Sequence, residues 1–465
     1  MRLVRIALAN VNTTVGATHS NTSRMIDAAK LAETDGATIT LFPEQAIGGY
    51  APEDLVQWEA FATAQWKELL RFAHETEALA SVCALGLSVL MDAQVYNAAA
   101  LVHRGKVLGI VPKEKLPTYN VFYEARTFAR GIPGVVREVN GVPFGDLVFQ
   151  FDFGTLSLEV CEDVWSPDGP MRRRCYAGAE LVCNLSASPF RLYVDETRRE
   201  MIATRSADNQ ATVAYVNLVG GNDGLVFDGG GLVFQNGRHV LDAPRFREGI
   251  AHVTVDLDRT SRLRRENTTW RSEQEAYAAE HAHEAQRAAH VQLVRVSSKT
   301  ERAGLAYPPP PHRSFFLPCE RAPKDARRDF CETLLDALAL GVGDYFEKTG
   351  AFRTIGVSLS GGRDSLLCLL IARRYVDRKY AALSPTLRDQ KAAEVLRAFY
   401  MPSRYSSDET RAAAEEAAKN VNAPFVVLSI DEAFEQELAL AAKMLQPGES
   451  VTAAAKQNIQ ARLRA

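Results

Sequence analysis

Three short stretches of the sequence place a reactive side chain where a strand is expected to end. The run TITLFPE ends in Glu44, the run LGIVPKEKLP contains Lys113 and Lys115, and the run TLSLEVC ends in Cys161. Open α/β layers present catalytic groups at such strand ends. A thiolate can attack an amide carbon, a carboxylate can take the thiol proton and later activate water, and an ammonium can stabilise the developing oxyanion. Together these side chains would form a complete set for acyl transfer.

The surroundings of the cysteine also favour a reactive role. In TLSLEVC the leucines and the valine occupy alternate positions, so period-two alternation places Cys161 on the opposite face of the strand, with Ser157 and Glu159. A cysteine used only for packing would more naturally lie with the leucines. The acidic Glu162 and Asp163 would raise the pKa of a nearby thiol, so Cys161 needs a cation close by if it is to ionise. This requirement favours a lysine as its neighbour.

A second candidate site is the glycine loop SLSGGRDS at 358–365, which follows an apolar run and opens a helical pattern. Consecutive glycines let backbone N–H groups approach a phosphate chain, and the helix N-terminus adds a favourable dipole. Ser360 and Ser365 can donate hydroxyl hydrogen bonds, while Asp364 either caps the helix or orients Mg²⁺. The loop is not a Walker A motif, because no lysine follows the second glycine where that motif requires one. A plain strand-to-helix turn is the structural alternative.

The elements that must position these groups indicate two α/β units. Up to about residue 260, β-rich runs alternate with helical patterns, which favours a layered α/β domain. From about residue 326, strands alternate with helices, which predicts a parallel sheet. The expected domains are residues 1–265, a polar, proline-containing connector at 266–325, and residues 326–465, which we interpret as a partial domain. In the first domain single strands are expected at 2–10, 38–44, 81–90, 180–188, 212–221 and 250–258, and helices at 18–37, 53–79 and 195–210. Pairs of strands are expected around the Arg104-Gly105-Lys106 turn within 96–113, around Gly154 from about 147, and around the Asn236-Gly237 pair, a strong hairpin signal.

Composition excludes several classes of function. The 465 residues carry 54 basic and 57 acidic side chains, for a net charge of −3, so no basic field is available to hold nucleic acid or an anionic membrane. The sequence contains neither an N-terminal leader pattern nor a long apolar run. Seven scattered cysteines without a C-x-x-C pair argue against a disulfide framework or a zinc site. We therefore expect a cytoplasmic protein with small-molecule partners.

Three motifs in the first domain resemble those of a known superfamily. LFPEQAIGGY, PKEKLPTYNVFYEARTF and EVCEDVW, in that order, are similar to the signatures of the carbon-nitrogen hydrolase (nitrilase) superfamily. The versions K-x-x-L-P-x-Y, F-Y-E-x-R and C-E-D-x-W resemble those of the glutaminase domain of glutamine-dependent NAD synthetases, over residues 1–265. The resemblance implies an α-β-β-α sandwich with Glu44, Lys113 and Cys161 as catalytic residues, and it selects Lys113 over Lys115.

The same resemblance implies roles for residues around this triad. Glu124 would be a supporting second glutamate. The residues implied to surround a glutamine substrate are Tyr50, Tyr119, Glu162 and Ser188. One position departs from the pattern, because Val194 stands where relatives often carry a basic residue that could meet the substrate carboxylate. Glutamine preference would then depend on Arg191 or Arg198.

The second unit resembles a different superfamily. S-G-G-x-D-S after a strand is similar to the pyrophosphate loop of the ATP pyrophosphatases, and MPSRYSS (401–407) and QNIQARLR (457–464) resemble segments of NAD synthetases. The resemblance implies a doubly wound, Rossmann-like parallel sheet that uses ATP and Mg²⁺ and holds no prosthetic group. The implied ATP-binding residues are Ser360, Gly361, Gly362, Asp364, Ser365, Met401 and Ser403, with Asp364 also the candidate metal ligand.

Both resemblances together predict the chemistry of glutamine-dependent NAD synthetases. Glutamine would be hydrolysed through a Cys161 thioester, and the ammonia would displace AMP from ATP-adenylated deamido-NAD to give NAD. Resemblance to nitrilase-like domains also implies a homo-oligomer. Two alternatives are a stand-alone amidase or glutaminase with a degenerate C-terminal domain, and a non-enzymatic ATP-binding or assembly module on the same scaffold.

Overall fold

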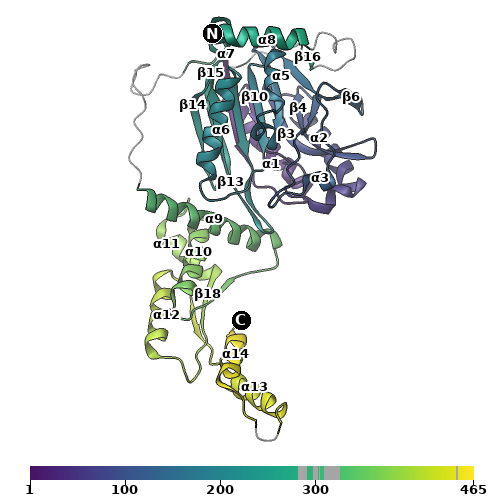
Figure 1. Ribbon diagram of the computed structural model, residues 1–465. Helices are drawn as coiled ribbons and strands as arrows, with labels where there is room; N and C mark the ends of the chain where they lie inside the picture. Colours follow the sequence, from purple (N-terminus) through teal and green to yellow (C-terminus); the bar gives the residue numbers. More distant parts are fainter. Residues whose placement is uncertain (281–290, 297–301, 303, 308–324, 447–448, 465) are drawn as a thin grey trace. The chain divides into compact units, whose positions relative to one another are not determined.

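The computed structural model describes residues 1–280, 291–296, 302, 304–307, 325–446 and 449–464. The chain forms two compact units, Met1–Pro323 and Lys324–Ala465 (Figure 1). Each unit has its own sheets and its own hydrophobic core. Among the described residues, none of the helices combines the length and the apolar character that crossing a membrane would require.

Two eight-stranded sheets form the frame of the first unit. The first sheet has the order β15-β1-β2-β3-β4-β5-β7-β6, and its strands are β1 (Leu3–Asn10), β2 (Ile39–Leu41), β3 (Val82–Met91), β4 (Gln94–His103), β5 (Lys106–Pro112), β6 (Val136–Val139), β7 (Val142–Gly145) and β15 (Gly249–Asp256). The second has the order β12-β13-β11-β10-β9-β8-β16, with β14 also paired to β13, and its strands are β8 (Leu147–Gln150), β9 (Thr155–Val160), β10 (Leu181–Ser186), β11 (Thr212–Asn217), β12 (Val219–Asn222), β13 (Leu225–Gln235), β14 (Arg238–Arg245) and β16 (Gln292–Arg295).

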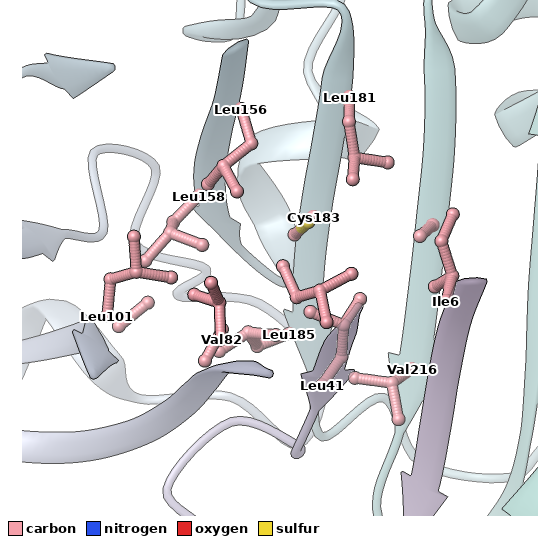
Figure 2. Close-up of a cluster of buried hydrophobic side chains, with 14 of the residues drawn as sticks. Ile6, Leu41, Val82, Leu101, Leu156, Leu158, Leu181, Cys183, Leu185 and Val216 are labelled. Atoms are coloured by element: carbon pink, nitrogen blue, oxygen red, sulfur yellow. The ribbon is translucent and has the colours of Figure 1, made fainter. Parts of the chain in front are cut away.

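The two sheets pack face to face, and helices cover their outer faces. Alternate apolar side chains of both sheets meet in one buried cluster, where Leu156, Leu158 and Leu185 of the second sheet face Leu41 and Val82 of the first (Figure 2). Because each strand turns successive side chains to opposite faces, the outer faces are apolar as well and pack against helices. The result is the expected α-β-β-α sandwich. The helices of this unit are α1 (Thr18–Thr34), the 3₁₀ turn η1 (Glu53–Gln57), α2 (Glu59–Glu75), α3 (Glu124–Thr127), α4 (Glu162–Trp165), α5 (Met171–Tyr176), α6 (Val194–Asp208), α7 (Leu257–Glu266) and α8 (Thr268–Glu280).

Three local predictions differ from the structure. The single helix expected at 53–79 is divided into η1 and α2, because Trp58 between them is extended. The strand expected at 212–221 is divided into β11 and β12. The stretch expected to be a connector contributes β16, which pairs in parallel with β8 of the second sheet; residues 281–290, 297–301, 303 and 308–324 of that stretch lie outside the described residues.

The second unit has a parallel three-stranded sheet of order β17-β18-β19, which confirms the predicted parallel pairing. Small and apolar side chains from the strands and from the helices α9, α10 and α12 form its core. Its elements are α9 (Ala326–Thr349), β17 (Ile355–Ser358), α10 (Arg363–Lys379), α11 (Pro385–Val395), β18 (Leu396–Tyr400), α12 (Asp408–Asn420), β19 (Phe425–Val427), α13 (Asp431–Lys443) and α14 (Ala453–Arg464).

Candidate active site

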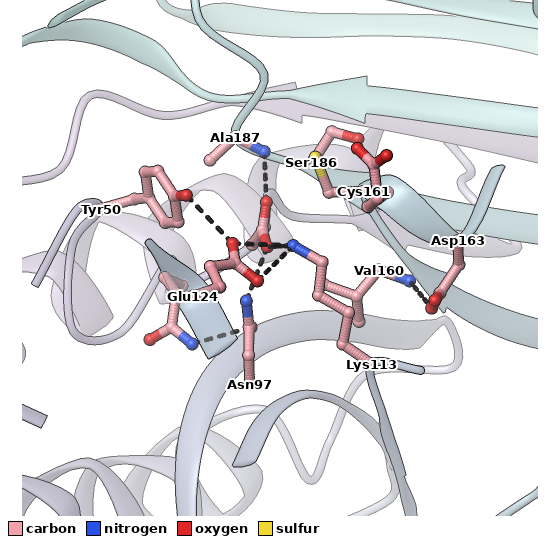
Figure 3. Close-up of polar contacts among 12 residues, drawn as sticks. Tyr50, Asn97, Lys113, Glu124, Val160, Cys161, Asp163, Ser186 and Ala187 are labelled. Carbon is pink, nitrogen blue, oxygen red and sulfur yellow. Dashed lines mark hydrogen bonds and ion pairs between the residues drawn. The ribbon is translucent and has the colours of Figure 1, made fainter. Parts of the chain in front are cut away.

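The three predicted strand ends converge in the first unit. Glu44 lies just after β2, Lys113 directly follows β5 of the same sheet, and Cys161 directly follows β9 of the other sheet. Lys113 Nζ lies 2.8 Å from Glu44 Oε1, and both side chains are completely buried. Cys161 lies beside this pair (Figure 3). The structure thus brings Glu44, Lys113 and Cys161 together from segments far apart in the sequence.

A second carboxylate, that of Glu124, forms an ion pair with Lys113. Glu124, the first residue of α3, has its Oε2 atom 2.7 Å from Lys113 Nζ, and its Oε1 atom accepts a hydrogen bond of 3.0 Å from the Tyr50 hydroxyl. Burial raises the pKa of Glu124, as does the negative charge of Glu44, while Lys113 opposes them. Burial alone would lower the pKa of Lys113, but the two carboxylates hold it well above its usual value. The two carboxylates therefore favour the charged, hydrogen-bond-donating form of Lys113.

Glu44 is held from both sheets. Its Oε2 atom accepts a 2.8 Å hydrogen bond from the backbone N–H of Ala187, which follows β10. Its Oε1 atom accepts from Lys113 Nζ and, at 2.7 Å, from Asn97 Nδ2 on β4. A carboxylate that accepts three hydrogen bonds in a buried site is fixed in position.

Cys161 occupies a strained turn. Its φ angle is +41°, in a region that residues with a side chain rarely adopt, and such outliers concentrate at functional sites. The predicted alternation does not extend to it, because β9 ends at Val160, and Cys161 packs with the apolar cluster that contains Leu156 and Leu158. Burial, and then the charge of Glu44, raises the pKa of the Cys161 thiol well above its usual value, while Lys113 opposes them. The resting thiol is protonated, so an attack by sulfur requires a base.

Asp163 joins the loop of the lysine to the loop of the cysteine. Its Oδ1 atom accepts from the backbone N–H groups of Glu114 and Lys115, at 3.0 and 2.9 Å, and its Oδ2 atom accepts from Val160 N–H at 3.1 Å. The side chain is buried. From the sequence, Asp163 is predicted only as a like charge near the thiol, whereas its position two residues after the cysteine lets it fix the spacing between the two loops.

A network of buried ion pairs holds the loop that follows Lys113, through Glu114. Arg174 is completely buried, and its guanidinium lies 2.8 Å from Asp146 Oδ1 and 3.1 Å from Glu114 Oε1. Arg173 pairs with the same two carboxylates. Glu159, on β9, is also completely buried, but its two oxygens have no hydrogen-bond partner among the described residues.

Polar and aromatic side chains form a rim above the cysteine. The Tyr119 hydroxyl donates to Glu162 Oε1 at 2.9 Å, and the Arg191 guanidinium lies 6.0 Å from the centre of the Trp165 ring. Among the described residues Arg191 forms no ion pair, and it is exposed. Burial raises the pKa of Tyr119 to about 12, with the hydrogen bond to Glu162 as the next cause.

The other candidate arginine is already engaged. Arg198 is buried and pairs with Asp228 at 2.8 Å, and its second terminal nitrogen donates to the backbone oxygen and the hydroxyl of Ser188, at 2.7 and 3.1 Å. Val194 is buried at the start of α6. Of the two arginines that could meet a substrate carboxylate, Arg191 is the one whose charge is not already compensated.

The glycine loop of the second unit lies between β17 and α10. Gly361 has a φ angle of +79°, and a Cβ atom there would lie 2.5 Å from the backbone oxygen of Thr410, so only glycine fits without strain. Ser360 Oγ accepts from Gly362 N–H at 3.2 Å and lies 3.1 Å from Ser365 Oγ. A cavity of about 430 Å³ opens beside the loop, and its lining includes Ser360, Met401, Ser403, Tyr405, Gln460 and Arg464.

Three of the seven predicted nucleotide-binding residues, Ser360, Met401 and Ser403, line this cavity, whereas the other four are not among its lining residues. Gln460 Nε2 of α14 donates to Ser403 Oγ at 2.9 Å, which links the QNIQARLR segment to the MPSRYSS segment. Asp364, at the start of α10, is exposed. Among the described residues there is no group of three or more His, Cys, Asp and Glu side chains that could hold a metal ion. A single carboxylate suits Mg²⁺ that arrives with a nucleotide, because that ion is usually bound through one or two carboxylates and the phosphates.

Comparisons with known proteins find a matching family for each unit. Residues 5–265 match the carbon-nitrogen hydrolase family, and residues 334–465 match the NAD synthase family. The glutamine-dependent NAD(+) synthetase of Aquifex aeolicus is 32% identical over all of this chain, which covers 72% of that protein. The enzyme of the same name from Thermotoga maritima is 30% identical, again over all of this chain and 71% of the relative.

Solved structures show the same fold. The glutamine-dependent NAD(+) synthetase of Cytophaga hutchinsonii superimposes with a TM-score of 0.76 at 22% identity, over all of this chain and 71% of that one. The enzyme of Acinetobacter baumannii, in complex with ADP, gives a TM-score of 0.72 at 24% identity, over 99% of this chain and 71% of that one. The α/β assignment of both units is therefore confirmed.

Proposed function

Because the chain belongs to the glutamine-dependent NAD(+) synthetases, enzymes that ligate carbon to nitrogen with ATP and glutamine, we propose that Cys161, Glu44 and Lys113 carry the glutaminase reaction. The observation that supports this proposal is the buried Lys113, which lies between the carboxylates of Glu44 and Glu124 with Cys161 close by.

In the first half-reaction Glu44 takes the thiol proton while Cys161 Sγ bonds to the amide carbon of glutamine. The carbonyl oxygen becomes an oxyanion, which Lys113 Nζ stabilises because a fixed ammonium in a dry site interacts strongly with developing charge. Collapse of this intermediate breaks the carbon–nitrogen bond, Glu44 returns the proton to the leaving nitrogen, and ammonia and a glutamyl thioester result.

In the second half-reaction Glu44 takes a proton from water, and the hydroxide attacks the thioester carbon. The sulfur leaves, Cys161 regains a proton, and glutamate is released. Glu124 holds Lys113 against Glu44 throughout and is thus a supporting residue. Because burial and Glu44 raise the thiol pKa, sulfur attack and proton transfer to Glu44 must be coupled.

Recognition of glutamine is assigned to the rim. An α-amino acid carries one positive and one negative group, and the rim offers one charge of each sign. Glu162, oriented by Tyr119, would bind the α-amino group, and Arg191 would bind the α-carboxylate in place of the basic residue that is absent at Val194. Ser188 and Tyr50 would complete the contacts to the substrate.

The second unit is proposed to adenylate deamido-NAD with MgATP and to let ammonia displace AMP. The glycine loop residues Ser360, Gly361, Gly362 and Ser365 would bind the pyrophosphate, and Met401 and Ser403 would line the nucleotide site. Asp364 would hold Mg²⁺ together with the phosphates. We further propose that the enzyme works in the cytoplasm as a homo-oligomer. A stand-alone amidase is not favoured, because residues 334–465 match the NAD synthase family.

Substitution of Cys161 by alanine tests the proposal. Purified wild-type protein is incubated with glutamine, glutamate release is measured, and an acid-quenched sample is examined by intact mass spectrometry for a covalent glutamyl group. We expect Cys161→Ala to abolish both signals, because no other thiol of the described residues lies beside Lys113 and Glu44. The matched control is Cys183→Ala, at a buried cysteine of the sandwich core, which should retain both. Equal glutamate release by Cys161→Ala and wild type would refute the proposal.

A further inference from the structure

A chain of buried amides and a hydroxyl runs from the core of the first sheet to Glu44. The Ser88 hydroxyl, on β3, donates to Gln45 Oε1 at 2.8 Å, and Gln45 Nε2 donates to Asn97 Oδ1 at 2.8 Å. Asn97 Nδ2 in turn donates to Glu44 Oε1 at 2.7 Å. Figure 3 shows Asn97 on the opposite side of the cluster from Ala187, which binds the other carboxylate oxygen.

Each member of the chain is shielded from water. Asn97 and Gln45 are completely buried, and Ser88 is 1% exposed. A buried amide that lost its partner would not find a replacement in solvent, so its hydrogen bonds must be made within the protein. The geometry of the chain is therefore imposed by the fold.

The direction of the donors follows from this closed arrangement. The Gln45 side-chain oxygen accepts from the Ser88 hydroxyl, so the Gln45 NH₂ group faces Asn97. The Asn97 side-chain oxygen accepts from Gln45, so the Asn97 NH₂ group faces Glu44. An NH₂ group can only donate, so Asn97 presents a donor to Glu44 Oε1, and a donor at this oxygen favours the ionised carboxylate over the acid. Reversal of the amides would aim an oxygen at Glu44 and favour the protonated acid.

The backbone keeps the chain in place. The Asn97 carbonyl accepts a 2.8 Å hydrogen bond from Lys113 N–H, so one residue orients both members of the buried ion pair. On β3, a Cβ atom at Gly86 would lie 2.4 Å from Gln45 N and 2.6 Å from Glu44 Cα. Gly86 thus lets the segment that carries Glu44 and Gln45 lie directly on the strand that carries Ser88.

We propose that Asn97 is a positioning residue, with Gln45 and Ser88 fixing its polarity, and that it holds Glu44 oriented and ionised for proton abstraction. This inference rests on the proposed role of Glu44 as the base. The other titratable groups that face Glu44 are Tyr50, Lys113, Glu124, Cys161 and Glu162. Tyr50 lies in the same loop as Glu44, between β2 and η1, and the other four come from other parts of the chain. None of the five belongs to a chain of buried amides.

The test is the pH dependence of glutamate release, measured as kcat/KM for the full chain. Asn97→Asp keeps the shape of the side chain but places a second carboxyl group against Glu44. Ser88→Ala is the milder variant, because it removes only the hydroxyl that sets the orientation of Gln45. The matched control is Asn21→Asp, at a buried asparagine whose amide binds the backbone oxygens of Thr14 and Ile47.

We expect the acid side of the Asn97→Asp profile to move to higher pH by about one to two units, a loss of about tenfold to a hundredfold in rate at low pH, with activity recovering as the pH rises. Ser88→Ala should move it in the same direction by less, and Asn21→Asp should not move it. If circular dichroism shows that Asn97→Asp does not fold, the pH profile of Ser88→Ala alone tests the inference.

Glu44→Gln separates this inference from the proposed function. If Glu44→Gln abolishes turnover while folded Asn97→Asp and Ser88→Ala keep the wild-type profile, the positioning role is wrong and the proposed base remains. If Glu44→Gln retains turnover, the proposed function itself fails and the inference fails with it. A purely structural role for Asn97 would lower thermal stability without moving the pH profile, which also overturns the inference.

Discussion

Replacing Glu159 by glutamine is expected to flatten the pH dependence of the stability of the first unit. Burial raises the pKa of Glu159 from its usual 4.5 to about 8. The nearest cation, Arg174, opposes this effect but is already paired with Asp146 and Glu114. Both Glu159 oxygens lack a hydrogen-bond partner among the described residues, so hydrogen bonds do not offset the cost of a buried negative charge.

The sign and the size of the effect follow from proton linkage. Below pH 4.5 the Glu159 carboxyl is protonated in the folded and the unfolded chain alike; between 4.5 and about 8 only the folded chain keeps the proton, so the free energy of unfolding falls as the pH rises. At about 1.4 kcal/mol per pH unit, this interval corresponds to a loss of at most about 5 kcal/mol. A neutral glutamine does not titrate and removes this loss, while any cost of its unpaired amide is independent of pH.

Urea unfolding followed by tryptophan fluorescence measures the effect on this unit alone, because the four tryptophans, Trp58, Trp66, Trp165 and Trp270, all lie in Met1–Pro323. The free energy of unfolding is determined at about pH 5 and about pH 8 for each protein. We expect Glu159→Gln to lose a few kcal/mol less than wild type between the two conditions. The control Glu138→Gln, at an exposed glutamate of β6, should behave like wild type. An identical loss in wild type and Glu159→Gln would show that the Glu159 carboxyl is not the source of the pH dependence.

Two further predictions concern substrate binding. Arg191→Ala should raise the KM for glutamine about tenfold, because one charge-assisted contact is lost. Arg191→Lys should restore much of the affinity for glutamine, and the KM for an amide that lacks an α-carboxylate should not change. An unchanged KM for glutamine in Arg191→Ala would show that Arg191 does not bind the substrate. Gly361→Ala should weaken ATP binding at least tenfold in isothermal titration calorimetry, because its Cβ would lie 2.5 Å from Thr410 O at a φ of +79°. The control Gly350→Ala, where a Cβ would meet open space at a φ of +62°, should bind ATP normally. Equal ATP affinity of the two variants would contradict this prediction.

The predicted active-site residues could be found because their signal is local. Glu44, Lys113 and Cys161 each stand at the end of a recognisable strand, and strand ends in a layered fold meet at a common edge. Asn97 was missed because its partners come from other strands. The only sign of it in the sequence is one polar residue in the apolar run YNAAALV, and a polar residue within a buried strand must find a partner.

The fold shows the same division between local and distant information. The Asn236-Gly237 pair correctly predicts the turn between β13 and β14, and Asn140-Gly141 gives the same signal between β6 and β7, where it was overlooked. β16 could not be predicted in this way. It has four residues, and its pairing partner β8 lies more than 140 positions earlier in the chain. Neither a turn nor a local periodicity therefore predicts this strand.

The parallel pairing of β16 with β8 determines where the glutaminase half could be separated from the rest of the chain. The carbon-nitrogen hydrolase match ends at residue 265, but β16 covers the edge of β8 and brings Val294 and Val296 onto the core between the sheets. Farther along, Arg302 pairs with Asp152 at 2.8 Å and lies over the Phe153 ring. A fragment that ended at the family boundary would expose a strand edge and apolar surface, and so would tend to aggregate. An independently folded amidase should extend beyond Arg302, and the evolutionary boundary and the physical boundary of this domain therefore differ.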